Sequence, residues 1–333
     1  MPASLKDVAA QAGVSVKTAS NVVNNYEFVS QSTRERVQAA IDELDYRPNL
    51  SARRLRTGRS NLIALSVPEI DAPYFAELAS EIVDAAERRG WTVLIDKTGG
   101  ERTHEQIAAA GIRAHLVDGA IASPLSMTAE DVAALSGSHP LVLLGERLPH
   151  VGGADHVAID NVAAAAEATH HLISLGRTSI ATIGASTEST GALRLKGFRK
   201  AIAATKRKHD PRLVMPVQEY HRQDGFDAMT RLLALDRRPD AVFCFNDLLA
   251  LGAIRAVHLA GLKVPSDVAV VGFDDIEDGR FSTPTLTTIS PDKAGIARAA
   301  VSLLARRIDA DAAIEAREVF ATHRLIVRES CGG

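Results

Sequence analysis

Charged and aromatic side chains follow several apolar runs between residues 61 and 290. Asp274 follows VAVVGF, Asn246 follows AVFCF, and Arg194 stands in the segment after SIATIG. Carboxylates, a guanidinium and an amide can make bidentate hydrogen bonds to hydroxyl groups, and an aromatic ring offers a face for stacking. This set is typical of a site for a sugar or a similar polar ring. The candidates are Asp71, Tyr74, Phe75, Glu146, Thr190, Arg194, Tyr220, Asn246 and Asp274.

Some of these residues also have a structural interpretation, which the sequence leaves open. Asp274 could cap a turn, and Arg194 could pair with a structural carboxylate. Tyr74 and Phe75 stand at the helical spacing of core residues, which is the interpretation we favour for Phe75. We interpret Asp247 as a helix N-cap rather than as a ligand.

The first 47 residues contain signals for three short helices. Ser4-Leu5-Lys6-Asp7 is a capping box, and Gly13 ends the first helix in a tight turn. Ser15 can cap a second helix, and Ser30 or Ser32 starts a third. The apolar stripe of the third helix consists of Val37, Ala40, Ile41 and Leu44. Three short helices with a glycine turn after the first predict a small all-α helix-turn-helix.

From Asn61 onward the chain alternates short apolar runs with helical stretches. The runs are NLIALSV, WTVLID, DGAIAS, PLVLLG, SIATIG, AVFCF and VAVVGF. Continuously apolar strands indicate a parallel sheet that is covered on both faces. Two such sets, at about 61–160 and 161–290, predict an α/β body of two doubly wound lobes, with crossings near 286–290 and 317–327. Ligands bind at the carboxyl ends of such strands, which is where the candidates stand.

Composition and charge exclude several classes of protein. The chain has 333 residues, of which 46% are apolar and 24% charged, with a net charge of −3. Residues 1–60 carry nine basic and six acidic residues, whereas the remainder carries 29 basic and 35 acidic ones. A basic head on an acidic body is consistent with nucleic-acid contact by the head. Because no apolar run could cross a membrane and no secretory signal is evident, we expect a cytoplasmic protein.

The motifs of common catalytic and metal sites are missing from the sequence. There is no P-loop, H-E-x-x-H, C-x-x-C or G-x-S-x-G motif. Cys244 and Cys331 are too few for a disulfide scaffold, and we interpret Cys244 as a core residue. Adjacent His170 and His171 face different ways on a helix. We therefore expect no catalytic residue, no metal site and no cofactor.

Three stretches near the N-terminus carry a resemblance to a known family. They are LKDVAAQAGVSVKTASNVVN, VSQSTRERVQAAIDELDYRPN and SARRLRTGRSNLIAL. They resemble the opening of LacI/GalR-family transcription regulators. RLKGF at 194–198, FNDLLALGAIRA and VVGFDD are also close to the family pattern. The body of that family resembles periplasmic sugar-binding proteins, which matches the two-lobed layout.

The resemblance implies that Val16, Lys17 and Asn21 read bases in the major groove. Lys17 can donate to guanine O6 and N7, and Val16 can touch a thymine methyl group. Many relatives carry arginine where this chain has Asn21, and asparagine prefers adenine. We expect the operator to differ from the common half-site at that base pair; a phosphate contact by Asn21 is the alternative. The candidates in the second helix are Ser15, Val16, Lys17, Thr18, Ser20 and Asn21.

Residues 49–56, between Pro48 and Thr57, are a separate candidate for a short helix. Isolated helices shorter than about 12–15 residues are marginal in water, so we expect this segment to be mostly unfolded without a partner. The resemblance implies a hinge helix that inserts Leu55 between base pairs, as minor-groove binders do. A flexible charged linker is the alternative. The candidates are Asn49, Ala52, Arg53 and Leu55.

These patterns predict a transcription regulator, in our interpretation a repressor, rather than an enzyme. We expect a homodimer on roughly palindromic double-stranded operator DNA, with a sugar or sugar derivative between the lobes controlling DNA affinity. A solute-binding protein of a sugar transporter is the alternative class. The predicted domains are the helix-turn-helix at 1–47, the hinge at 48–60, an N-terminal lobe at 61–160 with about 291–318, and a C-terminal lobe at 161–290 with about 319–333.

Overall fold

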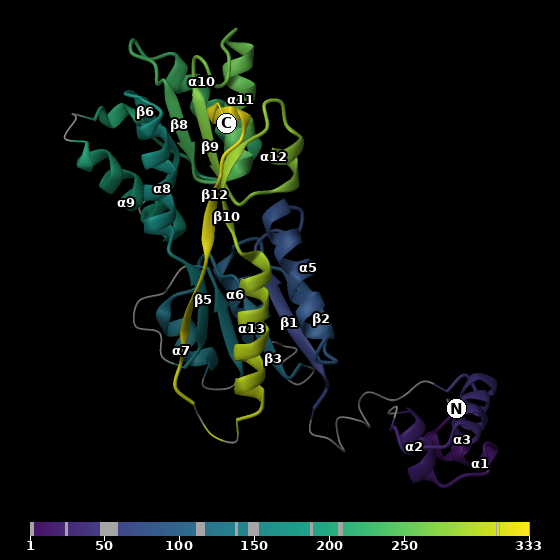
Figure 1. The fold of residues 1–333 in the computed structure, drawn as a ribbon. Coiled ribbons are helices and arrows are strands. Elements are labelled where there is room, and N and C mark those ends of the chain that lie inside the picture. Colours follow the sequence, from purple (N-terminus) through teal and green to yellow (C-terminus); the bar gives the residue numbers. More distant parts are fainter. Residues whose placement is uncertain are drawn as a thin grey trace. The chain divides into compact units, whose positions relative to one another are not determined.

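The structure, a computed structural model, divides into two compact units, Met1–Ser60 and Asn61–Gly333 (Figure 1). It describes residues 3–23, 26–46, 59–110, 117–136, 139–145, 153–186, 189–205, 209–310, 312 and 314–332. Within these ranges no helix has both the length and the apolar character needed to cross a membrane.

The first unit is helical throughout its described elements. Its helices are α1 (Leu5–Gln11), α2 (Val16–Val23) and α3 (Gln31–Glu43). The Asp7 amide donates to Ser4 Oγ at 3.4 Å and the Ser4 amide donates to Asp7 Oδ2 at 2.8 Å, which completes the capping box. Gly13 follows α1 with a φ of +62°, a conformation that glycine adopts without a steric penalty. The predicted helix-turn-helix is thereby confirmed.

Two serine caps position the helices of this unit. The Thr18 amide donates to Ser15 Oγ at 3.0 Å at the start of α2. Ser30, rather than Ser32, caps α3. A common core fixes the three helices against one another. It is made of the buried side chains Val8, Ala9, Ala12, Ala19, Val22, Val37 and Ala40.

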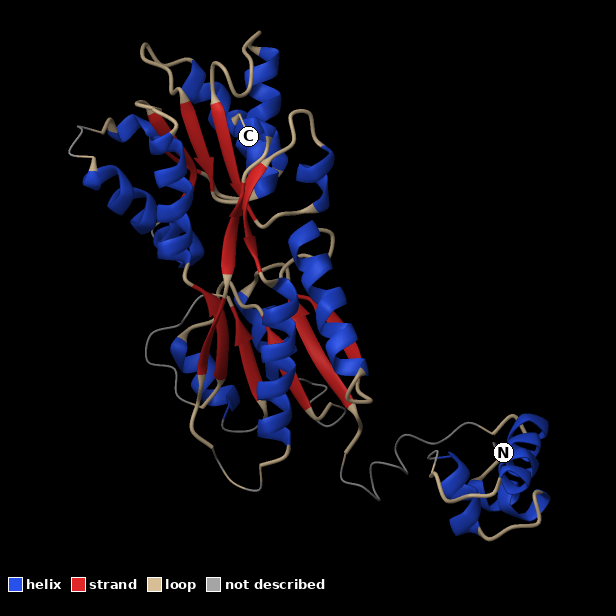
Figure 2. Ribbon diagram, in the orientation of Figure 1, coloured by secondary structure: helices blue, strands red, loops and turns tan. Residues whose placement is uncertain are grey.

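The second unit contains two six-stranded sheets among its described residues (Figure 2). The first sheet has the order β11-β5-β4-β3-β1-β2, and all its pairings are parallel. Its strands are β1 (Leu62–Val67), β2 (Thr92–Lys97), β3 (Gly119–Ala122), β4 (Leu141–Leu144), β5 (Asp155–Ile159) and β11 (Glu318–Ala321).

The second sheet has the order β12-β10-β9-β8-β6-β7. Its pairings are parallel except that β12 runs antiparallel to β10. Its strands are β6 (Ile180–Ala185), β7 (Val214–Pro216), β8 (Ala241–Cys244), β9 (Ala269–Phe273), β10 (Thr287–Pro291) and β12 (His323–Ile326). Two parallel α/β lobes were predicted, and this prediction is confirmed. We call them the N-terminal and C-terminal lobes, after the first and second sheet.

Helices flank both sheets (Figure 2). Those of the N-terminal lobe are α5 (Pro73–Glu87), α6 (Arg102–Ala110), α7 (Ala129–Ser136) and α13 (Lys293–Ile308). Those of the C-terminal lobe are α8 (Asn161–Ser174), α9 (Ser189–Ala204), α10 (Arg222–Leu233), α11 (Asp247–Leu259), α12 (Glu277–Phe281) and the 3₁₀ turns η1 (Pro211–Leu213) and η2 (Glu329–Cys331).

The last third of the chain passes repeatedly between the lobes. β10 belongs to the second sheet, α13 packs on β3, β4 and β5 of the first, β11 joins the first sheet and β12 returns to the second. Figure 1 shows β10 and β12 side by side where the lobes meet. These crossings fall in the predicted segments, whereas the domain boundaries stay a prediction.

Two strands, β5 and β7, are absent from the predicted set. β5 reads DHVAI and β7 has only three residues, so neither is an apolar run. β5 is nonetheless buried along its length. The charge of Asp155 at its start can be buried because arginines from α13 pair with it. At the sheet edge, β2 is more exposed than an apolar run covered on both faces would be.

Candidate functional site

A cavity of about 330 Å³ lies between the two lobes, where strands of both sheets end. Its volume falls in the range of roughly 300–1,000 Å³ that small-molecule sites occupy. Most of the predicted ligand residues line it, namely Tyr74, Phe75, Thr190, Arg194, Tyr220, Asn246 and Asp274. Asp71 does not: it is exposed, with its carboxylate 3.9 Å from Lys97 Nζ. Glu146 lies outside the described residues.

Asp274 brings a nearly buried carboxylate to this cavity. It follows β9 directly, is 8% exposed, and has a φ of +114°. Its amide donates to the Ile289 carbonyl at 2.8 Å, which fixes the backbone. Burial raises the pKa of Asp274 to about 6, although the charges of Arg194 and Lys293 act in the opposite direction. The carboxylate is therefore a strong acceptor at neutral pH that loses its charge on mild acidification.

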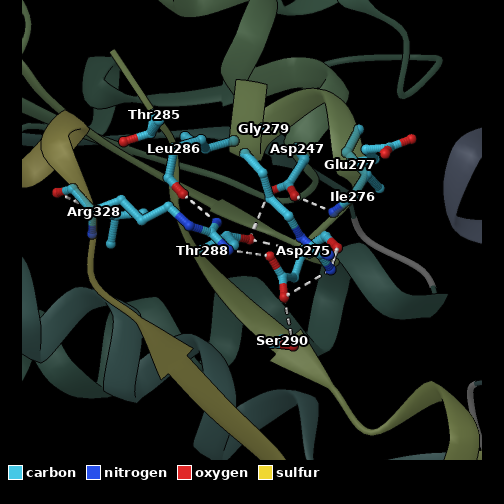
Figure 3. A network of polar contacts seen from close by, with 12 residues as sticks. Asp247, Asp275, Ile276, Glu277, Gly279, Thr285, Leu286, Thr288, Ser290 and Arg328 are labelled. Carbon is cyan, nitrogen blue, oxygen red and sulfur yellow. Dashed lines mark hydrogen bonds and ion pairs between the residues drawn. The ribbon is translucent and has the colours of Figure 1, made fainter. Parts of the chain in front are cut away.

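Two further aspartates, Asp247 and Asp275, anchor the chain near this site, and Figure 3 shows their hydrogen bonds. Asp247 accepts from the Ile276 amide at 3.0 Å and from Thr288 Oγ1 at 2.6 Å. Asp275 accepts from Arg328 at 2.6 Å and from Ser290 Oγ at 3.0 Å. These bonds tie the β9–α12 turn to β10 and to the end of the chain, so they hold Asp274 toward the cavity.

The two anchors have opposite titration behaviour. Burial, together with the charge of Asp274, raises the pKa of Asp247 well above its usual value. Burial acts the same way on Asp275, but hydrogen bonds from Arg328 and Ser290 and the charges of Arg328 and Arg280 lower its pKa overall. Asp247 is also not the N-cap that its position suggested. The N-cap is Asn246, and Asp247 is the first helical residue, fully buried.

Arg194 is fixed by neutral partners rather than by a structural carboxylate. Its Nε donates to Asn161 Oδ1 at 2.8 Å, and its Nη1 donates to the Phe245 carbonyl. The guanidinium also lies 3.4 Å from the centre of the Phe273 ring, a cation–π contact. It is 9% exposed. These contacts orient a pre-organised donor beside Asp274.

Hydrogen bonds fix Tyr220 and Asn246 in place and join the two residues to each other. The Tyr220 hydroxyl donates to the Gly184 carbonyl at 2.7 Å, and Asn246 Nδ2 donates to the Tyr220 carbonyl at 2.9 Å. Asn246 Oδ1 accepts the Leu249 amide at 2.8 Å as the cap of α11. A Cβ at Gly191 would lie 2.7 Å from the Tyr220 hydroxyl, so the ring fits only against glycine. Asn246 therefore positions Tyr220 as a wall of the cavity.

The remaining aromatic wall comes from the N-terminal lobe. Tyr74 and Phe75 stand edge to face with ring centroids 5.3 Å apart at the start of α5. Both pack against the buried core and both line the cavity, so the core interpretation of Phe75 and its predicted site position are compatible.

Several lining residues lie outside the predicted set. Glu69 follows β1 and His221 caps α10, and their side chains meet across the lobes at 3.1 Å. Asn161 follows β5, and Ser123 follows β3. The signal that could have found Glu69 is its position two residues beyond an apolar run, whereas the Glu69–His221 contact joins residues far apart in sequence.

A buried carboxylate behind the cavity holds the loop that follows β3. Glu105 of α6 accepts the amides of Leu125 at 2.6 Å, Ser126 at 2.9 Å and Met127 at 2.9 Å. Ser123, Pro124 and Leu125 of the same loop line the cavity. Glu105 is 2% exposed and does not itself line the cavity, so its effect on a ligand would act through the loop.

Replacement of Glu105 by glutamine is expected to loosen this loop. Amide exchange at Leu125, Ser126 and Met127 should accelerate by roughly tenfold or more, because an amide replaces an acceptor of charge-assisted bonds. Hydrogen–deuterium exchange with mass spectrometry measures this. Asp131→Asn is the matched control, since Asp131 joins α6 to α7 through Arg102 and accepts none of the three amides. Equal exchange in wild type and Glu105→Gln would contradict the assignment.

The residues predicted to contact DNA in the second helix lie on or directly before α2 of the first unit. Along α2, Val16 is 45% exposed and Lys17 is exposed, while Thr18, Ser20 and Asn21 are partly exposed. Ala19 and Val22 point into the core. Ser15 is exposed and engaged as the cap of α2. The predicted hinge residues Asn49, Ala52, Arg53 and Leu55 lie outside the described residues.

Two family models match the chain. Residues 4–49 match the model described as bacterial regulatory proteins, lacI family, and residues 169–331 match the periplasmic binding protein-like domain. The HTH-type transcriptional repressor PurR of Haemophilus influenzae (strain PittEE) is 34% identical over 307 residues, which cover 92% of this chain and 91% of that protein.

Solved structures of two regulators are also similar. The lac repressor dimer bound to operator and the anti-inducer ONPF has a TM-score of 0.85 and 27% identity, covering 99% of both chains. The complex of the transcriptional regulator CelR with cellobiose has a TM-score of 0.73 and 31% identity, covering 98% of this chain and 99% of that one. With full-length similarity to a repressor and a matched DNA-binding region, the chain belongs to the LacI family of bacterial regulatory proteins.

Proposed function

We propose that this DNA-binding transcriptional repressor of the LacI family responds to a sugar or sugar derivative bound between its two lobes. The observation that carries the proposal is that two nearly buried side chains, Asp274 and Arg194, line the same cavity as the rings of Tyr74 and Tyr220. A carboxylate and a guanidinium can hydrogen-bond to vicinal hydroxyls, and aromatic rings can stack on the C–H face of a sugar. CelR, which resembles this chain over its full length, is described in complex with the sugar cellobiose.

The proposed function requires the binding of operator DNA and of an effector, and no chemical reaction. Within the described ranges no group of three His, Cys, Asp or Glu side chains could hold a metal ion. The helix-turn-helix match at residues 4–49 supports a regulator rather than the solute-binding protein of a sugar transporter. Because bacterial operators lie in the cytoplasm, the protein acts there. We propose that the chain is not an enzyme.

On DNA, the protein is proposed to act as a homodimer on a roughly palindromic operator. Support comes from the lac repressor, which is a dimer when bound to its operator. Val16, Lys17 and Asn21 are proposed to read bases, and Leu55 to insert in the minor groove. Effector binding would shift the lobes and thereby the hinge, with a coupling of about 1–3 kcal/mol, or roughly 5–150-fold in DNA affinity.

Asn21→Arg is expected to change the base preference at one position of each half-site from adenine to guanine. Arginine makes bidentate bonds to guanine O6 and N7, and a good bidentate pair discriminates by about 1–3 kcal/mol. In vitro selection from random duplex DNA with each variant measures the preference. Unchanged preference with a steeper salt dependence of affinity would mean that residue 21 contacts only phosphate.

The function itself is tested with the selected operator. Fluorescence anisotropy of labelled operator, titrated with the full chain, should give specific binding at near-physiological salt. Adding sugars from a panel should change the operator affinity, and purine bases serve as the competing class. Regulation by a purine, or by neither class, would contradict the sugar proposal.

A further inference from the structure

The charges that line the cavity are unevenly balanced. Among the described lining residues the acidic side chains are Glu69, Glu219 and Asp274, and the basic ones are Arg194 and His221. With His221 neutral, three carboxylates face one guanidinium, an excess of two negative charges. At neutral pH the lining is therefore acidic.

Both basic groups are already engaged by the protein. Arg194 donates to Asn161 Oδ1 and to the Phe245 carbonyl, and it lies over the Phe273 ring. His221 Nε2 lies 3.1 Å from Glu69 Oε1. An incoming anion would have to compete with these contacts for either group.

Lys293 also acts electrostatically on Asp274, but it stands outside the lining. Its ammonium donates to Glu77 Oε2 at 2.6 Å and to the Asp275 carbonyl at 3.1 Å.

Apolar side chains occupy much of the remaining lining. They include Leu125, Leu144, Ile159, Ile276 and Ile296. In such surroundings a carboxylate repels an anion more strongly than it would in open water, because less solvent screens the two charges. A ring with uncharged hydroxyls, in contrast, can donate to Asp274 and lay its C–H face on the apolar wall.

We infer that the effector is an uncharged polyhydroxy compound and that this cavity discriminates against phosphorylated sugars and sugar acids. The inference rests on the sugar-binding function proposed above for the same cavity. The acidic lining repels negatively charged ligands, and the aromatic and apolar walls bind the ring of an uncharged sugar. The sites of repulsion are Asp274 within the cavity and the more exposed Glu69 and Glu219.

Matched pairs of probes test the inference with the full chain. Isothermal titration calorimetry compares D-glucose with D-glucose 6-phosphate, D-ribose with D-ribose 5-phosphate, and trehalose with trehalose 6-phosphate. Cellobiose and D-gluconate complete the panel. The neutral member of a binding pair is expected to bind at least about 100-fold more tightly than its phosphate at low ionic strength. Added salt should narrow that ratio, because it screens the exposed carboxylates.

The outcomes separate this inference from the proposed function. Equal or tighter binding of a phosphorylated probe or of gluconate overturns the inference and leaves a sugar-responsive regulator. Binding of no sugar, neutral or charged, overturns the proposed function and the inference with it. Glu219→Lys gives a second measurement: it should improve the affinity for the phosphorylated member by roughly tenfold or more. An unchanged ratio in this variant would overturn selection by charge.

Discussion

Asp274→Asn is expected to weaken effector binding and at the same time to stabilise the protein at neutral pH. Loss of a charged acceptor within the cavity should cost about 1.5–3 kcal/mol of binding free energy, or roughly 10–100-fold in affinity. The fold should gain about 3 kcal/mol at most, because the pKa of Asp274 lies near 6 instead of 3.8. Calorimetry measures the first effect, and urea unfolding of the free protein measures the second.

The sign of the stability effect follows from linkage. The folded state holds the proton of Asp274 more tightly than the unfolded chain, so the ionised carboxylate costs stability above about pH 6. As the pH falls from 6 toward 4, the folded state takes up the proton first and this cost disappears. The stability difference between Asp274→Asn and wild type should therefore be largest above pH 7 and vanish near pH 4. Effector affinity of the wild type should fall as the pH drops through 6.

Asp275→Asn is the matched control for this prediction. Asp275 is the next residue, but its pKa is lowered, since its bonds to Arg328 and Ser290 outweigh burial. Its contribution to stability is present above the unfolded pKa and is lost as the pH falls. Asp275→Asn should therefore destabilise at neutral pH. Destabilisation by Asp274→Asn as well would show that Asp274 is a structural residue and not a ligand group whose ionised form costs stability.

Local sequence signals were enough to predict the helix-turn-helix. The capping residues Ser4, Ser15 and Ser30 and the turn at Gly13 each act within a few residues of their own helix. Such signals do not depend on the rest of the fold. The choice between Ser30 and Ser32 could not be made from the sequence, because both precede the same apolar stripe.

The cavity was predictable to the extent that it follows from topology. In parallel lobes the strands end at one edge, so Asp274, Arg194 and Tyr220 converge although they are distant in sequence. What each side chain does there was not predictable. The side-chain oxygen of Asn246 accepts the cap hydrogen bond of α11, and its nitrogen donates to the Tyr220 carbonyl. The side chain of Asp71 is exposed and does not line the cavity.

Residues that act through long-range pairing gave no local signal. Glu105 is an ordinary helical glutamate in sequence, and only the fold shows the three amides that it accepts. Asp155 and His156 interrupt β5 so that no apolar run is visible. In both cases the partner of the buried charge belongs to another helix, strand or loop. The periodicity of apolar residues along the sequence does not reveal such a partner.

Asp155→Asn is expected to be among the most destabilising conservative substitutions in the second unit. Asp155 is fully buried and accepts from Arg306 at 2.8 Å, from Arg307 at 2.9 Å and from the Arg317 amide at 2.6 Å. These bonds join β5 to the end of α13 and to the chain that enters β11. Removing one partner of a buried ion pair leaves an uncompensated charge and costs about 3–5 kcal/mol. Urea unfolding measures the loss.

The expected loss of stability arises from the burial of Asp155 and not from the number of its ion pairs, and an exposed ion pair serves as the control. Asp210 and Arg212 form a pair of 2.7 Å on the surface, so Asp210→Asn should change stability little. Adding Arg307→Gln to Asp155→Asn should recover part of the loss, because it removes one of the stranded charges. Equal effects of Asp155→Asn and Asp210→Asn would mean that solvent reaches Asp155. Full additivity of Asp155→Asn and Arg307→Gln would contradict an energetic coupling between the two side chains, which the 2.9 Å contact predicts.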